Sequence, residues 1–200
     1  MNSNQTIDYY EKNADSFVAG TQSVDFTEIQ DRFLSFLPAD GFILDFGCGS
    51  GRDTKFFLEK GFNVEAVDGS EALCKIASEN TGITVKHMLF QELDAVEKYD
   101  GIWTCASILH LPKESLKDVF KKMICATKNG GYIYVSFKYG EFEGYRGDRY
   151  FTDFTESKFK DFIRNFPVLT IIDQRITCDV RPNRENEKWL NLIIKKSNTI

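Results

Sequence analysis

Residues 44–53 read LDFGCGSGRD, and this stretch places three glycines at alternate positions directly after a short apolar run. The apolar residues Phe42 to Phe46 predict a buried strand, and Asp53 to Lys60, closed by Gly61, predicts the helix that follows it. A strand that turns sharply into a helix leaves free backbone N–H groups at the start of the helix, and glycine lets a ligand approach them closely. The stretch therefore predicts a cradle for a polar ligand.

A regular alternation of strands and helices is predicted along the rest of the chain. Further strands are predicted at Asn63 to Val67, Ile83 to Met88, Tyr99 to Cys105 and Gly131 to Phe137, with helices at Ser70 to Asn80 and Lys113 to Ala126. Such an alternation is typical of a parallel sheet that helices cover on both faces. A helix at Ser157 to Phe166 precedes two more strands, Leu169 to Thr177 and Trp189 to Lys195, which could pair in antiparallel fashion. Helical spacing of apolar residues between Thr6 and Phe36 predicts two helices before the first strand.

Length, composition and charge bound the class of protein. A chain of 200 residues with 42% hydrophobic content can bury one sizeable core, so a single domain is expected. The net charge of -5 argues against partners bound by bulk attraction, such as nucleic acid or an anionic membrane. No apolar run approaches the roughly 18 residues of a membrane span, and residues 1–10 lack the features of a secretory signal. We therefore expect a cytoplasmic protein without a membrane partner.

The cysteines and histidines do not predict a metal site. The five cysteines lie far apart without a CxxC pair, and an odd number cannot all pair within one chain. The two histidines, His87 and His110, form no ligand cluster with them. We therefore expect reduced thiols and no metal.

An acidic residue, Asp68, ends the second predicted strand. In open parallel sheets this position commonly binds ribose hydroxyls, which favours a ligand that contains a ribose. The dinucleotide fingerprint G-x-G-x-x-G/A does not fit, because counting from Gly47 places Arg52 last and counting from Gly49 places Thr54 last. The glycine spacing thus argues against a ligand bound through a pyrophosphate.

The stretch DFGCGSG, residues 45–51, resembles the first motif of class I S-adenosylmethionine-dependent methyltransferases. The resemblance extends over most of the chain: residues 99–103 (YDGIW) resemble the family's fourth strand, residues 106–111 (ASILHL) the loop after it, and residues 128–131 (KNGG) the turn before the fifth strand. It implies an α/β fold: a single-domain, Rossmann-like, seven-stranded, mostly parallel sheet with helices on both faces and a C-terminal antiparallel hairpin.

The resemblance also implies a cofactor, S-adenosyl-L-methionine, and residues that bind it. The glycine loop would lie against the methionine portion, Asp68 would bind the ribose hydroxyls, and Asp45 would contact the amino end. Residues 90–93 match the segment that borders the adenine. The predicted cofactor-binding residues are Asp45, Gly47, Gly49, Gly51, Arg52, Asp68, Gln91, Glu92 and Leu93.

A methyl group on a sulfonium is already activated, so the protein's main task is to align the acceptor and exclude water. If the acceptor carries a proton, His110 is the candidate catalytic base by residue type and position; the alternative is that it only packs between its leucine neighbours. Arg52 could pair with the cofactor carboxylate or be a solvated residue at the helix start. Tyr9 and Tyr10 could cover the sulfonium or simply form an apolar helix face.

The acceptor is expected to bind between two loops, Lys138 to Thr155 and Asp179 to Lys188, because topology places both at the ligand edge of the sheet. The predicted substrate-binding residues are Tyr139, Arg146, Arg149, Tyr150, Arg181 and Arg184, which suit an anionic or planar group. Acidic neighbours, Glu141, Glu143, Asp148 and Asp179, could instead neutralise those arginines.

The sequence therefore predicts a methyltransferase that transfers a methyl group to a small-molecule acceptor by direct in-line displacement. We expect residues 1–40 to form an N-terminal helical cap, 41–137 the cofactor-binding core, and 138–200 the substrate loop and C-terminal hairpin. The alternatives are an RNA or protein methyltransferase, an NAD-dependent oxidoreductase, or a non-catalytic protein that binds S-adenosylmethionine.

Overall fold

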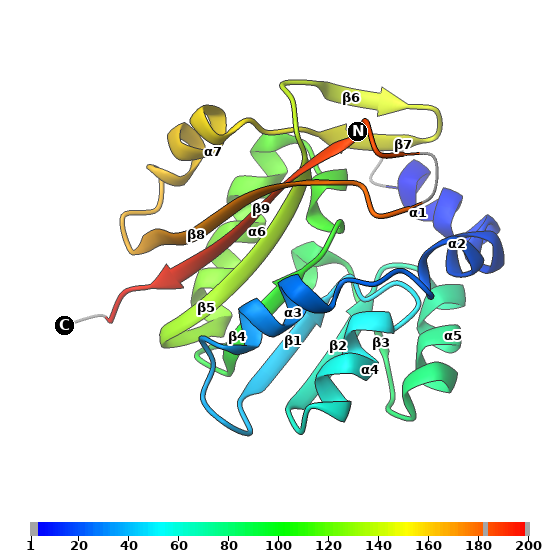
Figure 1. The fold of residues 1–200 in the computed structure, drawn as a ribbon, viewed down its shortest axis with the longest axis horizontal. Helices are drawn as coiled ribbons and strands as arrows, with labels where there is room; N and C mark the ends of the chain where they lie inside the picture. Colours follow the sequence, from blue (N-terminus) through cyan, green and yellow to red (C-terminus); the bar gives the residue numbers. More distant parts are fainter. Residues whose placement is uncertain (1–3, 182–183, 199–200) are drawn as a thin grey trace.

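A seven-stranded sheet with strand order β3-β2-β1-β4-β5-β9-β8 organises the protein. The structure is a computed structural model that describes residues 4–181 and 184–198. The strands of this sheet are β1 (Phe42–Phe46), β2 (Asn63–Asp68), β3 (Lys86–His87), β4 (Tyr99–Thr104), β5 (Thr127–Lys138), β8 (Leu169–Cys178) and β9 (Lys188–Lys196). The first five are parallel to one another, whereas β9 runs antiparallel to both β5 and β8 (Figure 1). The predicted mostly parallel sheet with a C-terminal antiparallel hairpin is confirmed.

Helices cover both faces of the sheet. They are α1 (Asn4–Lys12), α2 (Ala14–Thr21), α3 (Thr27–Leu34), α4 (Arg52–Glu59), α5 (Glu71–Thr81), α6 (Lys113–Ala126) and α7 (Glu156–Ile163), with short 3-10 turns η1 (Phe90–Glu92) and η2 (Ile108–His110). Consecutive residues of β1 face opposite sides of the sheet: Ile43 packs with Phe33 of α3 and Phe57 of α4, whereas Leu44 packs on the side of α6 and α7. Because β1 is buried on both faces, its sequence is mostly apolar and does not alternate between apolar and polar residues. Among the described residues, no helix is long and apolar enough to cross a membrane.

The N-terminal segment forms three helices, so the prediction of two was wrong. The break between α1 and α2 falls at Asn13, whose backbone is not helical (φ -119°, ψ 20°). The Asn13 side-chain amide donates to the Tyr9 carbonyl at 2.7 Å. Asparagine competes in this way with the backbone hydrogen bonds of a helix, which apolar periodicity does not reveal.

The third strand is also much shorter than the predicted Ile83 to Met88. Only Lys86 and His87 pair with β2, because the chain then turns into η1 at the edge of the sheet. His87, which the predicted strand includes, does lie in β3, but it is exposed, and its Nε2 lies 3.0 Å from the Gly69 carbonyl oxygen.

The segment predicted as a long loop, Lys138 to Thr155, contains a separate two-stranded hairpin of β6 (Glu143–Arg146) and β7 (Arg149–Thr152). Its turn is Gly147 and Asp148, and Gly147 has a φ of +59°, which glycine adopts without strain. The hairpin lies beside α1 (Figure 1), where Tyr150 N donates to Thr6 Oγ1 at 3.0 Å.

Candidate functional site

A cavity of about 530 Å³ lies at the carboxyl ends of the parallel strands. The glycine turn after β1, Asp68 at the end of β2, and the segments after β3 and β4 all contribute to its wall. Helix α1, the β6–β7 hairpin and the loop between β8 and β9 line it from other directions. The volume lies in the range of small-molecule and cofactor sites, and the position is where open parallel sheets bind ligands.

The glycine turn is held in place by the neighbouring strand. The backbone N–H groups of Gly47 and Cys48 both donate to the Val67 carbonyl, at 2.9 and 3.0 Å. Gly47 has a φ of +88°, and a Cβ atom there would lie 2.5 Å from Cβ of Ser107. Gly49 has a φ of +56° and lines the cavity. Glycine is therefore required both for the backbone conformation and for the close approach of the loop after β4.

The Asp68 carboxylate faces the cavity in a fixed orientation. Its Oδ2 accepts from Gly49 N and its Oδ1 from Ser70 N, both at 2.9 Å. Burial raises its pKa, and these backbone hydrogen bonds oppose the rise. Each carboxylate oxygen has a further lone pair, so Asp68 can still accept hydrogen bonds from ligand hydroxyls.

The segment after β3 lines the cavity only in part. Phe90 and Gln91 contribute to the wall. Glu92 does not, because its carboxylate turns back to accept from Leu89 N at 2.7 Å. Leu93 is 3% exposed and belongs to the core on the α6 side. Of the three residues of this segment that were predicted to bind the cofactor, Gln91 lines the cavity and Glu92 and Leu93 do not.

Asp45 lies behind the cavity wall. It is 1% exposed, and its Oδ2 accepts from Thr54 Oγ1 at 2.6 Å. Burial, together with the nearby Asp53 carboxylate, raises its pKa. The side chain joins the end of β1 to the first turn of α4 and does not line the cavity.

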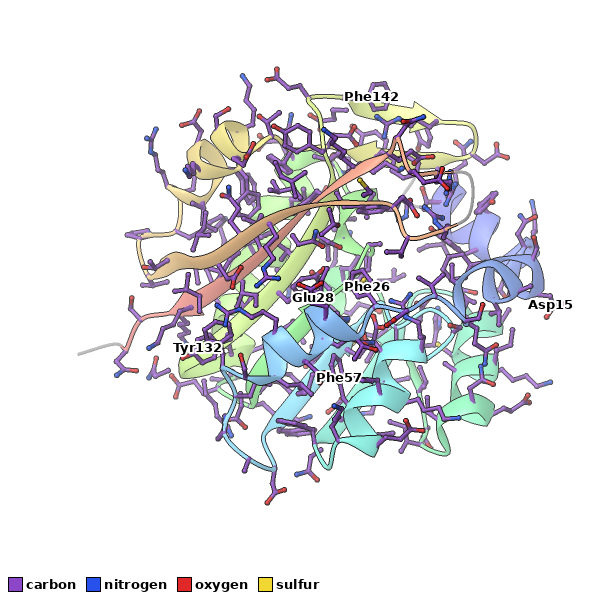
Figure 2. The ribbon with its side chains drawn as sticks, viewed as in Figure 1. Asp15, Phe26, Glu28, Phe57, Tyr132 and Phe142 are labelled. Atoms are coloured by element: carbon purple, nitrogen blue, oxygen red, sulfur yellow. The ribbon has the colours of Figure 1, made fainter. Side chains whose placement is uncertain are left out.

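Arg52 lines the cavity with its charge already compensated. Its Nε and Nη2 donate to the two carboxylate oxygens of Asp53, at 2.7 and 3.0 Å. The same carboxylate accepts from Gln30 Nε2 at 2.7 Å and from Trp103 Nε1 at 2.8 Å. The guanidinium also lies over the ring of Phe26, which Figure 2 labels, at 5.1 Å. Arg52 is therefore a fixed part of the wall, and of the two alternatives the arrangement does not fit a solvated residue at the helix start.

His110 and Tyr10 form a hydrogen-bonded pair in the cavity wall. His110 Nδ1 lies 2.6 Å from the Tyr150 carbonyl oxygen, and its Nε2 lies 2.8 Å from the Tyr10 hydroxyl. Burial lowers the pKa of His110 to about 4, and the positive charge of Arg149 adds to the effect. The imidazole is therefore neutral at neutral pH. Because a carbonyl only accepts, Nδ1 carries the proton and Nε2 accepts from Tyr10.

The two substrate loops reach the cavity with four of their six predicted residues: Arg149, Tyr150, Arg181 and Arg184. Tyr139 instead donates to Glu156 at 2.8 Å, and Arg146 pairs with Asp153 through both Nη atoms, at 2.9 and 2.5 Å. Neither of these two side chains lines the cavity.

Carboxylates compensate part of the positive charge on these loops. Asp179 pairs with Arg181 at 2.5 Å, and Glu187 pairs with Arg184 at 2.8 Å. Of the acidic neighbours weighed from the sequence, Asp179 is thus the one that holds a cavity arginine.

Several wall residues were not predicted as site residues. Helix α1, α2 and the segment after α2 contribute Thr6, Ile7, Phe17, Thr21, Val24 and Phe26, and β9 contributes Trp189 and Asn191. Their side chains look like an ordinary apolar helix face or a buried strand, and only the folding of these elements over the sheet edge reveals them.

Comparisons with known proteins agree with this architecture. The chain matches the family described as methyltransferase domain over residues 43–131. It is 26% identical over 125 residues to an uncharacterized methyltransferase of Staphylococcus carnosus, covering 62% of this chain and 59% of that protein. It is 27% identical over 120 residues to the 18S rRNA (guanine-N(7))-methyltransferase bud23 of Schizosaccharomyces pombe, covering 52% and 45%. The chain thus spans about half the length of the curated relatives that it matches.

Among solved structures, the fold is similar to that of the 1,6-didemethyltoxoflavin-N1-methyltransferase of Burkholderia thailandensis. The TM-score is 0.75 at 20% identity, over 96% of this chain and 85% of that one. The fold and the glycine turn define a Rossmann-like α/β protein with a cavity at the carboxyl ends of its parallel strands. Residues 43–131 thus match a methyltransferase domain, and the fold is similar to that of solved S-adenosylmethionine-dependent methyltransferases.

Proposed function

We propose that this protein binds S-adenosylmethionine in the cavity and transfers its methyl group to a small-molecule acceptor by direct in-line displacement. One observation carries the proposal: the glycine turn and the oriented Asp68 carboxylate meet at a cavity of about 530 Å³ at the carboxyl ends of the strands. When bound, the cofactor supplies a methyl group that its sulfonium has already activated. The protein's contribution is to hold both reactants in line and to exclude water.

The cavity wall offers suitable partners for each part of the cofactor. In this proposal Asp68 accepts from the ribose hydroxyls, residues Gly47 to Ser50 of the turn lie against the methionine portion, and Phe90 and Gln91 border the adenine. Gly51 does not line the cavity and packs against Ala77 and Thr81 of α5. Arg52 stands beside the turn, held by Asp53. Asp45 acts from behind the wall by anchoring the start of α4.

The enclosure of the cavity supports a small acceptor. Helix α1 and the β6–β7 hairpin meet over it, joined by the hydrogen bond from Tyr150 N to Thr6 Oγ1. We propose that residues 41–137 hold the cofactor, residues 1–40 cover it, and residues 138–200 hold the acceptor.

We propose that His110 serves as the base and acts through Tyr10. Both ring nitrogens of His110 are hydrogen-bonded, so its Nε2 reaches the cavity through the Tyr10 hydroxyl. An acceptor N–H or O–H would give its proton to the Tyr10 oxygen while Tyr10 gives its own proton to His110 Nε2. The proton lost by the acceptor thus ends on the imidazole.

Titration calorimetry with S-adenosylmethionine, S-adenosylhomocysteine and NAD tests the proposed function. We expect micromolar binding of the first two and no binding of NAD, because the glycine turn lacks the pyrophosphate fingerprint. Binding of NAD alone would show an oxidoreductase-type site. Failure of all three ligands to bind would equally refute the proposal.

The Tyr10→Phe variant is expected to lower turnover by about 100-fold, since general base catalysis contributes on this scale. The ring packing is kept, so the affinity for S-adenosylhomocysteine should stay within about twofold. In the unmodified protein the pKa of His110 is about 4, so its turnover should fall only below about pH 5. The measurement is S-adenosylhomocysteine formation with an acceptor found by screening small molecules.

The matched control is Tyr132→Phe, which removes a tyrosine hydroxyl in β5 at a residue that does not line the cavity (Tyr132 is labelled in Figure 2). It should keep the turnover of the unmodified protein. Equal turnover in Tyr10→Phe and the control would remove Tyr10 from the proton path.

A further inference from the structure

The cations of the cavity wall differ in how their charge is balanced. Arg52, Arg181 and Arg184 each pair with a carboxylate, and so does Lys138, whose partner is Glu187. Arg149 also lines the cavity. Within residues 4–181 and 184–198, no Asp or Glu oxygen lies within 4.0 Å of its side-chain nitrogens. Its positive charge is therefore uncompensated in the part of the chain that the structure describes.

Aromatic rings hold the Arg149 guanidinium in place instead. It lies over the rings of Tyr9, Phe151 and Tyr10, with 4.8, 5.3 and 5.9 Å to the ring centroids. Its Nη1 donates to the Tyr10 hydroxyl at a long distance of 3.4 Å. Cation–π contacts orient a guanidinium but use few of its five N–H donors. The planar edge of Arg149 thus keeps donors for a ligand.

The neighbouring strand shows the compensated counterpart. Arg146 faces Arg149 in the hairpin register, and it also lies over Phe151, at 5.2 Å. A buried carboxylate, Asp153, pairs with Arg146 through both of its oxygens. Asp153, directly after the hairpin, thus pairs with Arg146 outside the cavity, whereas no carboxylate of the described residues pairs with Arg149, which lines the cavity.

We propose that the acceptor is a small planar carboxylic acid, whose carboxylate forms paired hydrogen bonds with the guanidinium of Arg149. This inference rests on the proposed methyl transfer and names its substrate class. The planar fork of arginine matches a carboxylate in two parallel hydrogen bonds. Tyr10, Tyr145, Tyr150 and Phe151 also line the cavity, and their rings suit a conjugated or aromatic body.

The position of Arg149 also couples acid binding to the proposed base. Its hydrogen bond to Tyr10 places the bound carboxylate beside the Tyr10–His110 pair. The charge of Arg149 is one cause of the lowered pKa of His110. A bound carboxylate cancels that charge, so the base becomes stronger when an acid occupies the site.

Binding of matched acids and amides to protein saturated with S-adenosylhomocysteine tests the inference. The probes are benzoate, salicylate, anthranilate and nicotinate, each compared with its primary amide by calorimetry. We expect at least one acid to bind about tenfold or more tightly than its amide, since hydrogen bonds between charged partners supply such a difference. In Arg149→Gln this preference should fall below about twofold, and Arg149→Lys should retain part of it.

Arg164→Gln is the charge-matched control. Arg164 is a surface residue whose side chain is 78% exposed, and its loss changes the net charge by the same amount. This variant should keep the full preference for the acid. The inference is overturned if no acid binds, if amides bind as tightly as acids, or if the preference survives in Arg149→Gln. These outcomes are distinct from failure to bind S-adenosylhomocysteine, which would instead refute the proposed function.

Discussion

Replacing Asp68 with alanine is expected to weaken the binding of S-adenosylhomocysteine by about 100-fold or more. A hydrogen bond to a charged group contributes about 1.5–3 kcal/mol, and in our proposal the carboxylate accepts two from the ribose. The variant also removes the acceptor of Gly49 N and Ser70 N, both bonded at 2.9 Å, and thereby loosens the glycine turn. Titration calorimetry on the purified variant measures the effect.

Two further variants test whether the loss of affinity depends on the charge of the Asp68 side chain and on its position in the cavity. Asp68→Asn keeps the size of the side chain but loses the charge and one acceptor oxygen, so we expect an intermediate loss of affinity. Glu71→Ala removes a carboxylate that is 77% exposed in the first turn of α5, and it should bind within about twofold of the unmodified protein. Unchanged affinity in Asp68→Ala would mean that the residue only shapes the turn.

Asp53→Ala is expected to destabilise the protein by about 3–5 kcal/mol, the scale seen when one partner of a buried ion pair is removed. The carboxylate is 6% exposed and accepts from three side chains: Arg52, Gln30 and Trp103. Without it, the indole N–H and the amide remain buried without this acceptor, and the guanidinium loses its counter-charge. Chemical denaturation followed by circular dichroism measures the change in the free energy of unfolding.

Asp118→Ala provides the comparison for this effect. Asp118 is 72% exposed and pairs with Lys121 on the surface of α6, so its loss should cost about 0.5 kcal/mol or less. If Asp53→Ala costs no more than this control, the buried network does not stabilise the fold. Because Arg52 lines the cavity, the Asp53 variant should also bind S-adenosylhomocysteine less tightly.

Much of the fold was predictable because it follows from patterns that are local in the chain. The apolar run at Phe42 to Phe46 lies next to its glycine turn, and buried runs recur in β4 and β5. The break at Asn13 and the hairpin at Gly147 were missed for an equally local reason. A single side-chain hydrogen bond and a single two-residue turn decide them, and neither changes the apolar periodicity.

The position of the cavity that we propose holds the cofactor was predictable for the same reason. Gly49 and Asp68 are 19 residues apart, within one strand–helix–strand unit whose geometry is nearly constant. The directions of the Glu92 and Leu93 side chains were not predictable in this way. The pattern places their segment next to the cavity, but the direction of each side chain depends on η1 and on core packing.

The sequence by itself determined the parallel sheet, the glycine turn and the acidic end of β2, because each depends on residues close together in the chain. Only the tertiary structure decided which polar groups meet above them. Tyr10 and His110 are 100 residues apart, and Arg149 and Tyr10 are 139 apart. Their contacts depend on how α1 and the β6–β7 hairpin pack over the sheet edge. Arg146 and Arg149 are the same residue type on one hairpin, and only packing gives the first a carboxylate and leaves the second facing the cavity.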